Sequence, residues 1–382
     1  MKIKTIRKLD PTKLKVPQTC CGTGFSEGAD KPPCCGPPTS AGGGVIDENV
    51  PGFLEWVATD IGRVPQIGTA LTLSDHLGAC KARWSIGRMN YLVPPGLYAI
   101  GTPNPEDPVL VTANYKMSYD IVRRQLAGRN VWLLVLETFG VNVWCAAGKG
   151  TFGTKELVRR VQLSGLAKVV SHRRLTLPIL GAPGVAAHEV AKRTGFSIQY
   201  ATIRAEDLPK FLDNGMKTTE GMRKLTFTVY ERLVLIPVEL VTAAKPTAII
   251  MAVLGGAFGI VGGTSAAIMA MIAYLGAVLA GLVVAPLLLP CLPGRSFSIK
   301  GAVVGILWSF ALCLVGAKCS AVMTVAAVIG LPAISAFYSL NFTGCTTFTS
   351  RSGVKKEMRL ALPVMGCAIA ASLLLVVVSR FI

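Results

Sequence analysis

The sequence predicts an α/β Rossmann-like domain followed by an all-α transmembrane domain of about five helices. Two observations predict this division. Apolar strands alternate with helices between residues 109 and 212, whereas residues 246–382 contain only eight Lys and Arg residues and a single acid, Glu357. A stretch so poor in charge and so rich in Ala, Val, Leu and Ile is typical of a membrane tail.

The α/β prediction depends on short apolar runs separated by amphipathic stretches. We expect strands at 91–93, 97–100, 109–113, 131–136, 175–180 and 197–203, and helices at 118–127, 154–163, 185–193 and 205–212. Strands that are apolar on both faces and alternate with helices indicate a parallel sheet covered on each side. Residues 51–88 carry only weak signals.

The first 50 residues form a Lys-, Pro- and Gly-rich segment that is typical of a flexible arm. It contains two vicinal pairs, Cys20-Cys21 and Cys34-Cys35. Paired thiolates suit a soft metal ion, so capture of such an ion is one hypothesis for them. The alternative is a solvated arm with incidental cysteines. The predicted domains are therefore the arm at 1–50, a cytoplasmic domain at 51–245 and a transmembrane domain at 246–382.

Five apolar stretches of the tail are each near the roughly 20 residues that cross a bilayer. They are 246–262, 264–290, 301–317, 319–340 and 360–379. The first and third are short, so a count of four remains open.

The loops after spans two and four hold six basic residues, whereas the opposite side holds only Lys318 and Arg380. This asymmetry predicts a cytoplasmic N-terminal domain and an outside C-terminus in the cell (inner) membrane. The near absence of charge within the spans favours an anchor over a pump.

The net charge of +18 is shared by both parts, with 31 basic against 20 acidic residues before residue 246 and eight against one after it. A basic domain beside a bilayer suits anionic headgroups or an acidic partner. No basic helix or RNP-like aromatic strand accompanies the charge, which argues against nucleic acid. The basic start lacks the apolar core of a signal peptide, so we expect a reducing compartment and cysteines that are thiols or metal ligands.

The most informative segment follows the predicted strand 131–136, at the edge where open α/β sheets bind ligands. Asn142 is a good N-cap and Gly148 a good stop, which predicts a helix at 143–147 with Cys145 in its first turn. The positive end of the peptide dipoles and the nearby Lys149 favour a thiolate, which is a soft metal ligand. Local context alone favours the alternative that Cys145 is a small buried apolar residue beside Trp144.

The segment at 142–149, Asn142-Val143-Trp144-Cys145-Ala146-Ala147-Gly148-Lys149, resembles the signature of the HgcA family, the membrane-anchored corrinoid proteins of mercury methylation. Further segments at 88–91, 95–98, 111–120, 180–190 and 231–240 are similar to the corrinoid-binding domain of the corrinoid iron–sulfur protein large subunit of the acetyl-CoA pathway. The five-span tail also fits the first family.

The resemblance implies a methyltransferase in which residues 142–149 bind a corrinoid (cobalamin-type) cofactor and Cys145 is the lower axial ligand of cobalt. It implies a methyltetrahydrofolate-type methyl donor or its methyltransferase, Hg(II) as the acceptor, methylmercury as the product, and a 4Fe-4S ferredoxin-like protein of the HgcB type as electron donor. The Cys pairs of the arm lack the spacing of cluster ligands, so we expect no iron–sulfur cluster in this chain. Asp75-His76-Leu77-Gly78 departs from the Asp-x-His-x-x-Gly pattern, which disfavours a histidine ligand.

Two alternatives remain open from the sequence. A membrane-bound corrinoid methyl carrier of one-carbon metabolism with another acceptor would have the same cobalt site. A membrane sensor or transporter with a nucleotide-binding Rossmann domain is the non-enzymatic alternative. No Gly-x-Gly-x-x-Gly turn follows the strand at 109–113, where Asn114-Tyr115-Lys116 stands instead, which disfavours the second.

Overall fold

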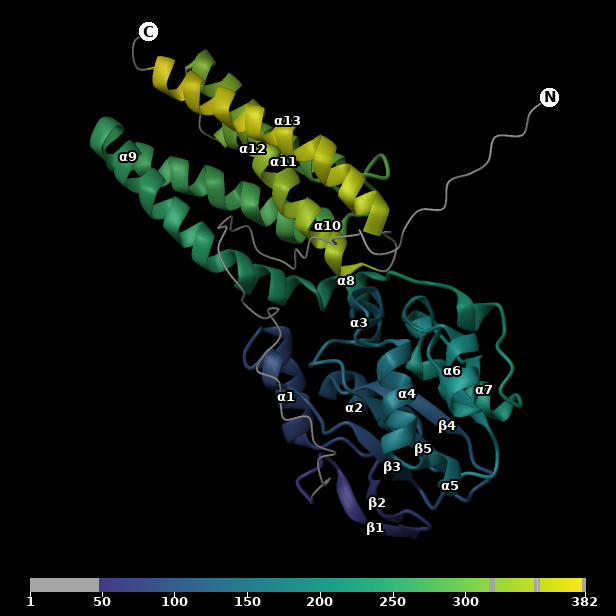
Figure 1. Ribbon diagram of the computed structural model, residues 1–382. Coiled ribbons are helices and arrows are strands. Elements are labelled where there is room, and N and C mark those ends of the chain that lie inside the picture. Colours follow the sequence, from purple (N-terminus) through teal and green to yellow (C-terminus); the bar gives the residue numbers. More distant parts are fainter. Residues whose placement is uncertain (1–47, 316–319, 347–348, 350, 380–382) are drawn as a thin grey trace, which may run out of the picture. The chain divides into compact units, whose positions relative to one another are not determined.

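The computed structural model describes residues 48–315, 320–346, 349 and 351–379. The predicted arm with Cys20, Cys21, Cys34 and Cys35 lies outside these ranges. The α/β part is built on a seven-stranded mixed sheet of order β1-β2-β3-β5-β4-β6-β7 (Figure 1). The strands are β1 Phe53–Thr59, β2 Gly62–Ile67, β3 Gly96–Ile100, β4 Val109–Ala113, β5 Val131–Leu136, β6 Arg174–Leu177 and β7 Ser197–Tyr200.

The central strands are buried on both faces, as their apolar runs predicted. Val109 and Val111 of β4 belong to one apolar cluster, whereas Leu110 between them belongs to another. Because successive side chains of a strand point to opposite faces, each face of the sheet must be covered by helices. The helices of this part are α1 Leu73–Arg83, α2 Lys116–Gln125, α3 Val143–Lys149, α4 Thr154–Leu163, α5 Leu166–Val169, α6 Ala187–Thr194 and α7 Leu208–Asp213, with short turns η2 Arg88–Asn90, η3 Ile179–Gly184, η4 Ala205–Asp207 and η5 Gly221–Arg223.

The expected all-parallel sheet is wrong on one side. The four strands β5, β4, β6 and β7 pair in parallel, but β3 is antiparallel to β5, and β1 and β2 form an antiparallel hairpin. The connection between β3 and β4 spans only residues 101–108, shorter than the dozen or so residues that a parallel crossover needs. Its length therefore accounts for the reversed strand.

The tail contains four helices among the described residues that are long and apolar enough to cross a membrane. The first is the run Val229–Leu287, which comprises α8 Val229–Leu233, α9 Ile236–Leu279, the π-helical turn η6 Ala280–Val284 and α10 Ala285–Leu287. The other three are α11 Phe297–Val315, α12 Ala321–Asn341 and α13 Arg351–Val378. The short turn η7 Phe342–Cys345 lies between α12 and α13.

The count of four, against about five expected, has its cause in a turn at Gly263. There the backbone has φ 74° and ψ −177°, outside the helical region, within a run of 59 residues. A straight helix of that length would extend roughly 88 Å, about three times the hydrocarbon thickness. Figure 1 shows α9 turning back on itself, and a Cβ on Gly255 would lie 3.1 Å from Sδ of Met271 across the turn. The two arms therefore correspond to the first two predicted spans.

Small residues allow the later helices of the tail to approach closely. A Cβ on Gly301 of α11 would lie 2.5 Å from Cβ of Ser339 on α12, and one on Gly305 would lie 2.6 Å from Cα of Pro332. Ser335 Oγ donates to the carbonyl oxygen of Gly301 at 2.7 Å. Such contacts are the usual means by which helices associate in lipid, where the hydrophobic effect no longer drives packing.

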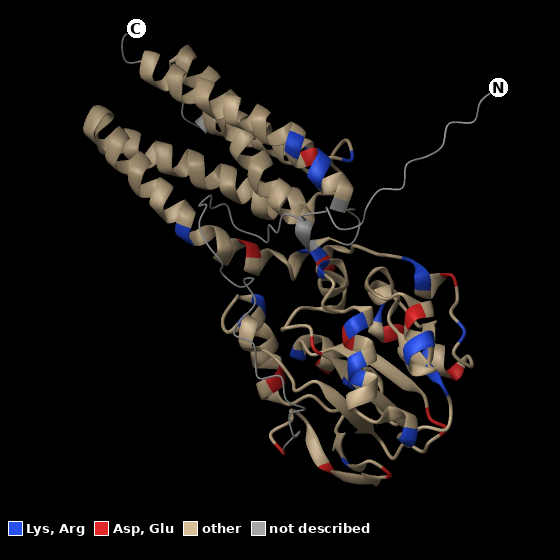
Figure 2. Cartoon of the chain, viewed as in Figure 1, with Lys and Arg blue, Asp and Glu red and all other residues tan. Residues whose placement is uncertain are grey.

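Charge is scarce along these helices and concentrates near a few helix ends (Figure 2). Glu357, the one acid of the tail, accepts hydrogen bonds from Ser296 Oγ at 2.6 Å and from the backbone N of Ser298 at 2.8 Å. The loops that follow the second and fourth predicted spans therefore meet at the same end of the helices. The six basic residues in these two loops predict that both loops lie on one side of the membrane, and the contact of Glu357 with Ser296 and Ser298 agrees with that prediction.

Candidate functional site

The segment with the sequence signature forms the short helix α3, as predicted. Asn142 is its N-cap, and the Oδ1 atom of Asn142 accepts a hydrogen bond from the backbone N of Cys145 at 2.9 Å. Cys145 lies in the first turn and is half-buried. The expected stop at Gly148 is wrong, because the helix continues to Lys149 and ends at Gly150, whose φ of 83° is readily adopted by glycine.

The remaining signature residues divide between the core and the surface. Ala146 and Ala147 are buried in the same apolar cluster as β4 and β5, which anchors one side of α3. Val143 and Trp144 are half-buried, whereas Gly148 and Lys149 are exposed. Cys145 therefore lies at the boundary between the core and the solvent-facing side of the helix.

The turn η3, which follows β6, fixes α3 from a second side. A Cβ on Gly184 would lie 2.1 Å from the carbonyl oxygen of Phe152 and 3.0 Å from Cα of Ala147. A Cβ on Gly181 would lie 2.5 Å from the ring of Phe152. These two glycines of the sequence Leu180-Gly-Ala-Pro-Gly184 thus allow the backbone to pack directly on the C-terminal part of α3.

The loop between β5 and α3 is pinned by the neighbouring strand. The last residues of β4 and β5, Ala113 and Leu136, are partners in the parallel ladder, so the two carboxyl ends meet. Asn114 then donates to Glu137 Oε1 at 2.7 Å and accepts from the backbone N of Thr138 at 3.0 Å. Phe139 adopts φ 55° in this loop, an unusual conformation for a residue with a side chain. Sequence reasoning missed Asn114 and Glu137, although polar residues directly after buried strands are a detectable signal.

A buried network of four charges joins α1 to α2 beside this edge. Lys116 Nζ lies 2.5 Å from Asp75 and 2.6 Å from Asp120, and Arg123 lies 2.8 Å from each of the same two carboxylates. Burial of Asp75 opposes ionisation, but hydrogen bonds from Lys116 and Thr72 outweigh it and hold the pKa of that carboxyl far below its usual range. The charges balance and every member is paired, so the network stabilises the position of α1.

The histidines take no part in the site. His76 and His188 are exposed, and His172 Nε2 lies 2.9 Å from the carbonyl oxygen of Asp107. In the described ranges, no group of three or more His, Cys, Asp or Glu side chains is arranged to hold a metal ion.

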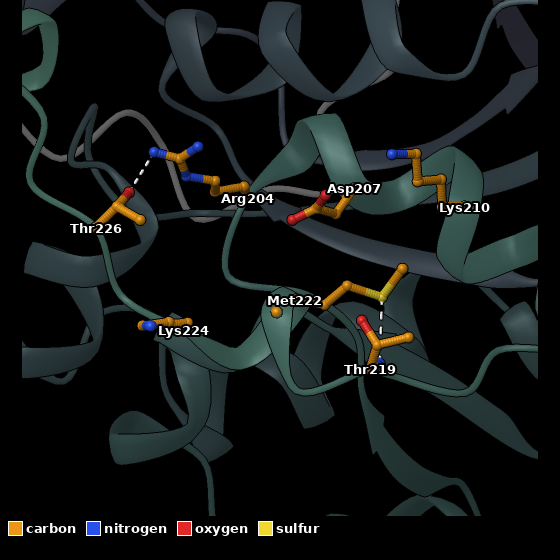
Figure 3. Close-up of a pocket in the computed structure, with 8 residues that line it drawn as sticks. Arg204, Asp207, Lys210, Thr219, Met222, Lys224 and Thr226 are labelled. Carbon is orange, nitrogen blue, oxygen red and sulfur yellow. Dashed lines mark hydrogen bonds between the residues drawn. The ribbon is translucent and has the colours of Figure 1, made fainter.

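A shallow pocket of about 320 Å³ lies beyond β7, away from the signature segment in sequence. It is lined by Arg204, Asp207, Lys210, Thr219, Gly221, Met222, Lys224 and Thr226. Arg204 is already paired with Glu231 at 2.6 Å, and Figure 3 shows Lys210 and Lys224 on opposite sides of the pocket. Because its cations do not converge, the pocket does not form an anion site, and none of residues 142–149 lines it.

Comparison with known proteins places the similarity on this part of the chain. Residues 87–211 match the family described as CO dehydrogenase/acetyl-CoA synthase delta subunit. This match lies within the α/β part. The matched range takes in β3 through most of α7 and includes α3, but none of the membrane-spanning helices.

Individual relatives are similar to this chain over a limited number of residues. The chain is 32% identical over 123 residues to the acetyl-CoA decarbonylase/synthase complex subunit gamma of Methanopyrus kandleri, covering 32% of this chain and 26% of the relative. It is 32% identical over 124 residues to the subunit gamma of Methanocaldococcus jannaschii, covering 32% and 25%, and 36% identical over 92 residues to that of Archaeoglobus fulgidus, covering 24% and 20%. The matched region thus spans about a quarter or less of these relatives.

Proposed function

We propose that this chain is a membrane-anchored, corrinoid-dependent methyltransferase that transfers a methyl group from cobalt to inorganic Hg(II), giving methylmercury. The observation that carries the proposal is the placement of Cys145 in the first turn of α3, at the carboxyl end of β5, within residues 87–211, which match the family described as CO dehydrogenase/acetyl-CoA synthase delta subunit. The signature at 142–149 supports the mercury branch of that proposal, and the apolar helices support membrane attachment.

The residues at this edge fit a corrinoid. Cys145 offers a soft donor, half-buried and next to the N-terminal end of a helix, where peptide dipoles favour the thiolate. The hydroxyl group of Tyr115, which follows β4, is buried with no hydrogen-bond partner in the described part of the chain. Residues 142–149 would hold the cofactor, with the sulfur atom of Cys145 as a ligand of its cobalt. When bound, the corrinoid would supply the capacity to carry a methyl group between a methyltetrahydrofolate-type donor and an acceptor.

The protein's own contribution is to hold the sulfur atom of Cys145 in one place and to tune its electron donation. The Asn142 cap fixes the backbone N of Cys145. Gly184 has no side chain, so η3 can pack closely against Ala147 of α3. A thiolate donates more electron density to a metal than an imidazole or water would, an axial-ligand effect of the kind that tunes haem iron. Donation from Cys145 would favour a methyl group that leaves with electrons, which the electrophile Hg(II) requires.

The proposal includes partners and a location. A 4Fe-4S ferredoxin-like protein of the HgcB type would supply low-potential electrons. The α/β domain at 51–245 would lie in the cytoplasm, because six basic residues near α11 and α13 gather at the end of the helices where Glu357 meets Ser296 and Ser298. The transmembrane part at 246–382 would serve as an anchor in the cell inner membrane. The arm cysteines Cys20, Cys21, Cys34 and Cys35 would bind Hg(II) when the concentration of that ion is low.

A second function is favoured by the names of the relatives. They are subunits of acetyl-CoA decarbonylase/synthase complexes, which supports a corrinoid methyl carrier whose acceptor is not mercury. Such a carrier would need the same cofactor site. The acceptor can be separated from the cofactor by experiment, since both functions need Cys145 but only one needs Hg(II).

The decisive experiment uses the full chain, reconstituted with cobalamin and then supplied with Hg(II). We expect base-off cobalamin with a thiolate-to-cobalt absorption and EPR signature that disappears in Cys145→Ala, and methylmercury formation that disappears with it. A signature without mercury methylation would favour the other methyl acceptor. Absence of cobalamin binding in a folded chain would overturn the corrinoid function altogether.

A further inference from the structure

Tyr115 is buried in a way that leaves its hydroxyl group without a partner. It directly follows Asn114 at the carboxyl end of β4, and the residue is only 3% exposed. Its hydroxyl oxygen has no hydrogen-bond partner in the described part of the chain. Buried polar groups in native folds are almost always hydrogen-bonded, so this hydroxyl group is a candidate for contact with a ligand.

The Arg88 side chain accompanies this hydroxyl group. Its guanidinium carbon lies 5.6 Å from the centre of the Tyr115 ring, and its Nη1 atom donates to the carbonyl oxygen of Ala82. Burial raises the pKa of Tyr115, and the positive charge of Arg88 opposes that rise. Among the described residues, no carboxylate lies within 4.0 Å of the Arg88 guanidinium group. Arg88 therefore has positive charge available for an anion.

The segment with Arg88 also contacts the loop that leads to Cys145. A Cβ on Gly140 would lie 2.6 Å from Cδ2 of Leu92 and 3.3 Å from the carbonyl oxygen of Met89. Leu92 in turn pairs with Tyr115 in an isolated antiparallel bridge. The segment with Arg88, the residue Tyr115 and the loop before α3 thus belong to one continuous edge of the sheet.

We propose that Arg88 and Tyr115 bind the phosphodiester group of the corrinoid's nucleotide tail, an inference that rests on the proposed corrinoid function. The side chains of the corrin ring are neutral amides, whereas the tail carries an anionic phosphodiester. Guanidinium groups bind phosphate oxygens through paired, charge-assisted hydrogen bonds. The Tyr115 hydroxyl group supplies a further donor, and in base-off cobalamin the tail is free to occupy a site of its own.

The test compares three corrinoids on the full chain in lipid nanodiscs, with affinity measured by visible absorption. Cobalamin has the whole tail, cobinamide phosphate keeps a phosphate without the base, and cobinamide lacks both. We expect the unaltered protein to bind the first two at least 10-fold more tightly than cobinamide. Arg88→Gln and Tyr115→Phe should remove roughly that 10-fold advantage, about 1.4 kcal/mol, and leave the affinity for cobinamide unchanged.

Control measurements separate this site from a purely structural role. Tyr115→Phe removes an unsatisfied hydroxyl group, so it should not lower the unfolding temperature of the cofactor-free protein. Arg129→Gln, which removes an equal charge from a residue paired with Asp213, should leave all three affinities unchanged. Inorganic phosphate should compete with cobinamide phosphate and not with cobinamide; phosphate binding without any preference among corrinoids would assign the site to a free anion.

Several outcomes overturn the inference. Equal losses for cobalamin and cobinamide in the variants would show that these residues only support the fold. Equal affinities of the unaltered protein for cobalamin and cobinamide would exclude a tail site while leaving the corrinoid function intact. Failure of the unaltered protein to bind any of the three corrinoids would overturn the proposed function, and the tail site with it.

Discussion

The Oδ1 atom of Asn142 accepts a hydrogen bond from the backbone N of Cys145 at 2.9 Å, so the residue that begins α3 also fixes the position of the candidate metal ligand. Asn142→Ala should lower stability by about 1 kcal/mol and loosen the first turn. We expect weaker cobalamin binding and a reduced thiolate-to-cobalt absorption, measured by titration. Asn142→Asp keeps a capping oxygen and should retain both; a loss as large as that of the alanine variant would show that the cap is not the cause.

Gly184 and Gly148 form a matched pair for testing the support of α3. In Gly184→Ala the new Cβ would meet the carbonyl oxygen of Phe152 at 2.1 Å, so α3 and η3 must separate, at a cost of about 1–3 kcal/mol. In Gly148→Ala the new Cβ meets no atom within 4 Å, and helix propensity should add up to about 1 kcal/mol of stability. Thermal unfolding of the two variants checks this difference. Equal unfolding temperatures would contradict the close packing of η3 on α3.

Asp75 predicts how the α/β domain responds to acid. Its pKa in the folded protein lies far below its ordinary value of 3.8, so its ion pairs stabilise the fold above that pH. The stabilisation is lost progressively as the pH falls below about 4, where the unfolded chain takes up the proton first. Asp75→Asn should therefore destabilise the protein at pH 7 and flatten the dependence of stability on pH below 5. Denaturant unfolding at several pH values measures both.

The exposed pair Arg129–Asp213 is the control for that prediction. The hydrogen bond from Arg129 also lowers the pKa of Asp213, but the carboxylate is exposed and screened by solvent. Asp213→Asn should leave the pH dependence of unfolding nearly unchanged. An effect as large as that of Asp75→Asn would mean that burial of the Asp75 network is not what matters.

The strands and helices that the sequence predicted well are those with an unambiguous apolar pattern. The runs of β4 and β5 are buried at every position, and α4 covers the predicted range 154–163. The hairpin β1–β2 escaped prediction because Glu55 and other exposed positions interrupt its apolar residues. Helix α1 was missed because its sequence does not have the continuous apolar stripe of a helix that packs on a core. Its leucines, Leu73 and Leu77, are exposed in the fold.

The candidate site could be predicted only where it is local in sequence. The Asn142 cap depends on two residues three positions apart, so sequence alone could identify it. The contact of Asn114 with Glu137 depends on β4 and β5 being neighbours, and the approach of Arg88 to Tyr115 depends on the path of the chain between α1 and β3. Strand order and loop packing are properties of the whole fold, which explains why these residues were missed.

The break at Gly263 predicts the topology of the tail. If α9 crosses the membrane twice and the α/β domain is cytoplasmic, as proposed, Thr264 is expected on the outer side and Gly294, just before α11, in the cytoplasm. In intact cells, a membrane-impermeant maleimide should therefore label Thr264→Cys above the level of the parent chain, and should label Gly294→Cys only after permeabilisation. If neither position is labelled before permeabilisation and both are labelled after it, the turn at Gly263 and the loop before α11 lie on the same side of the membrane. That result would contradict two crossings of the membrane by α9.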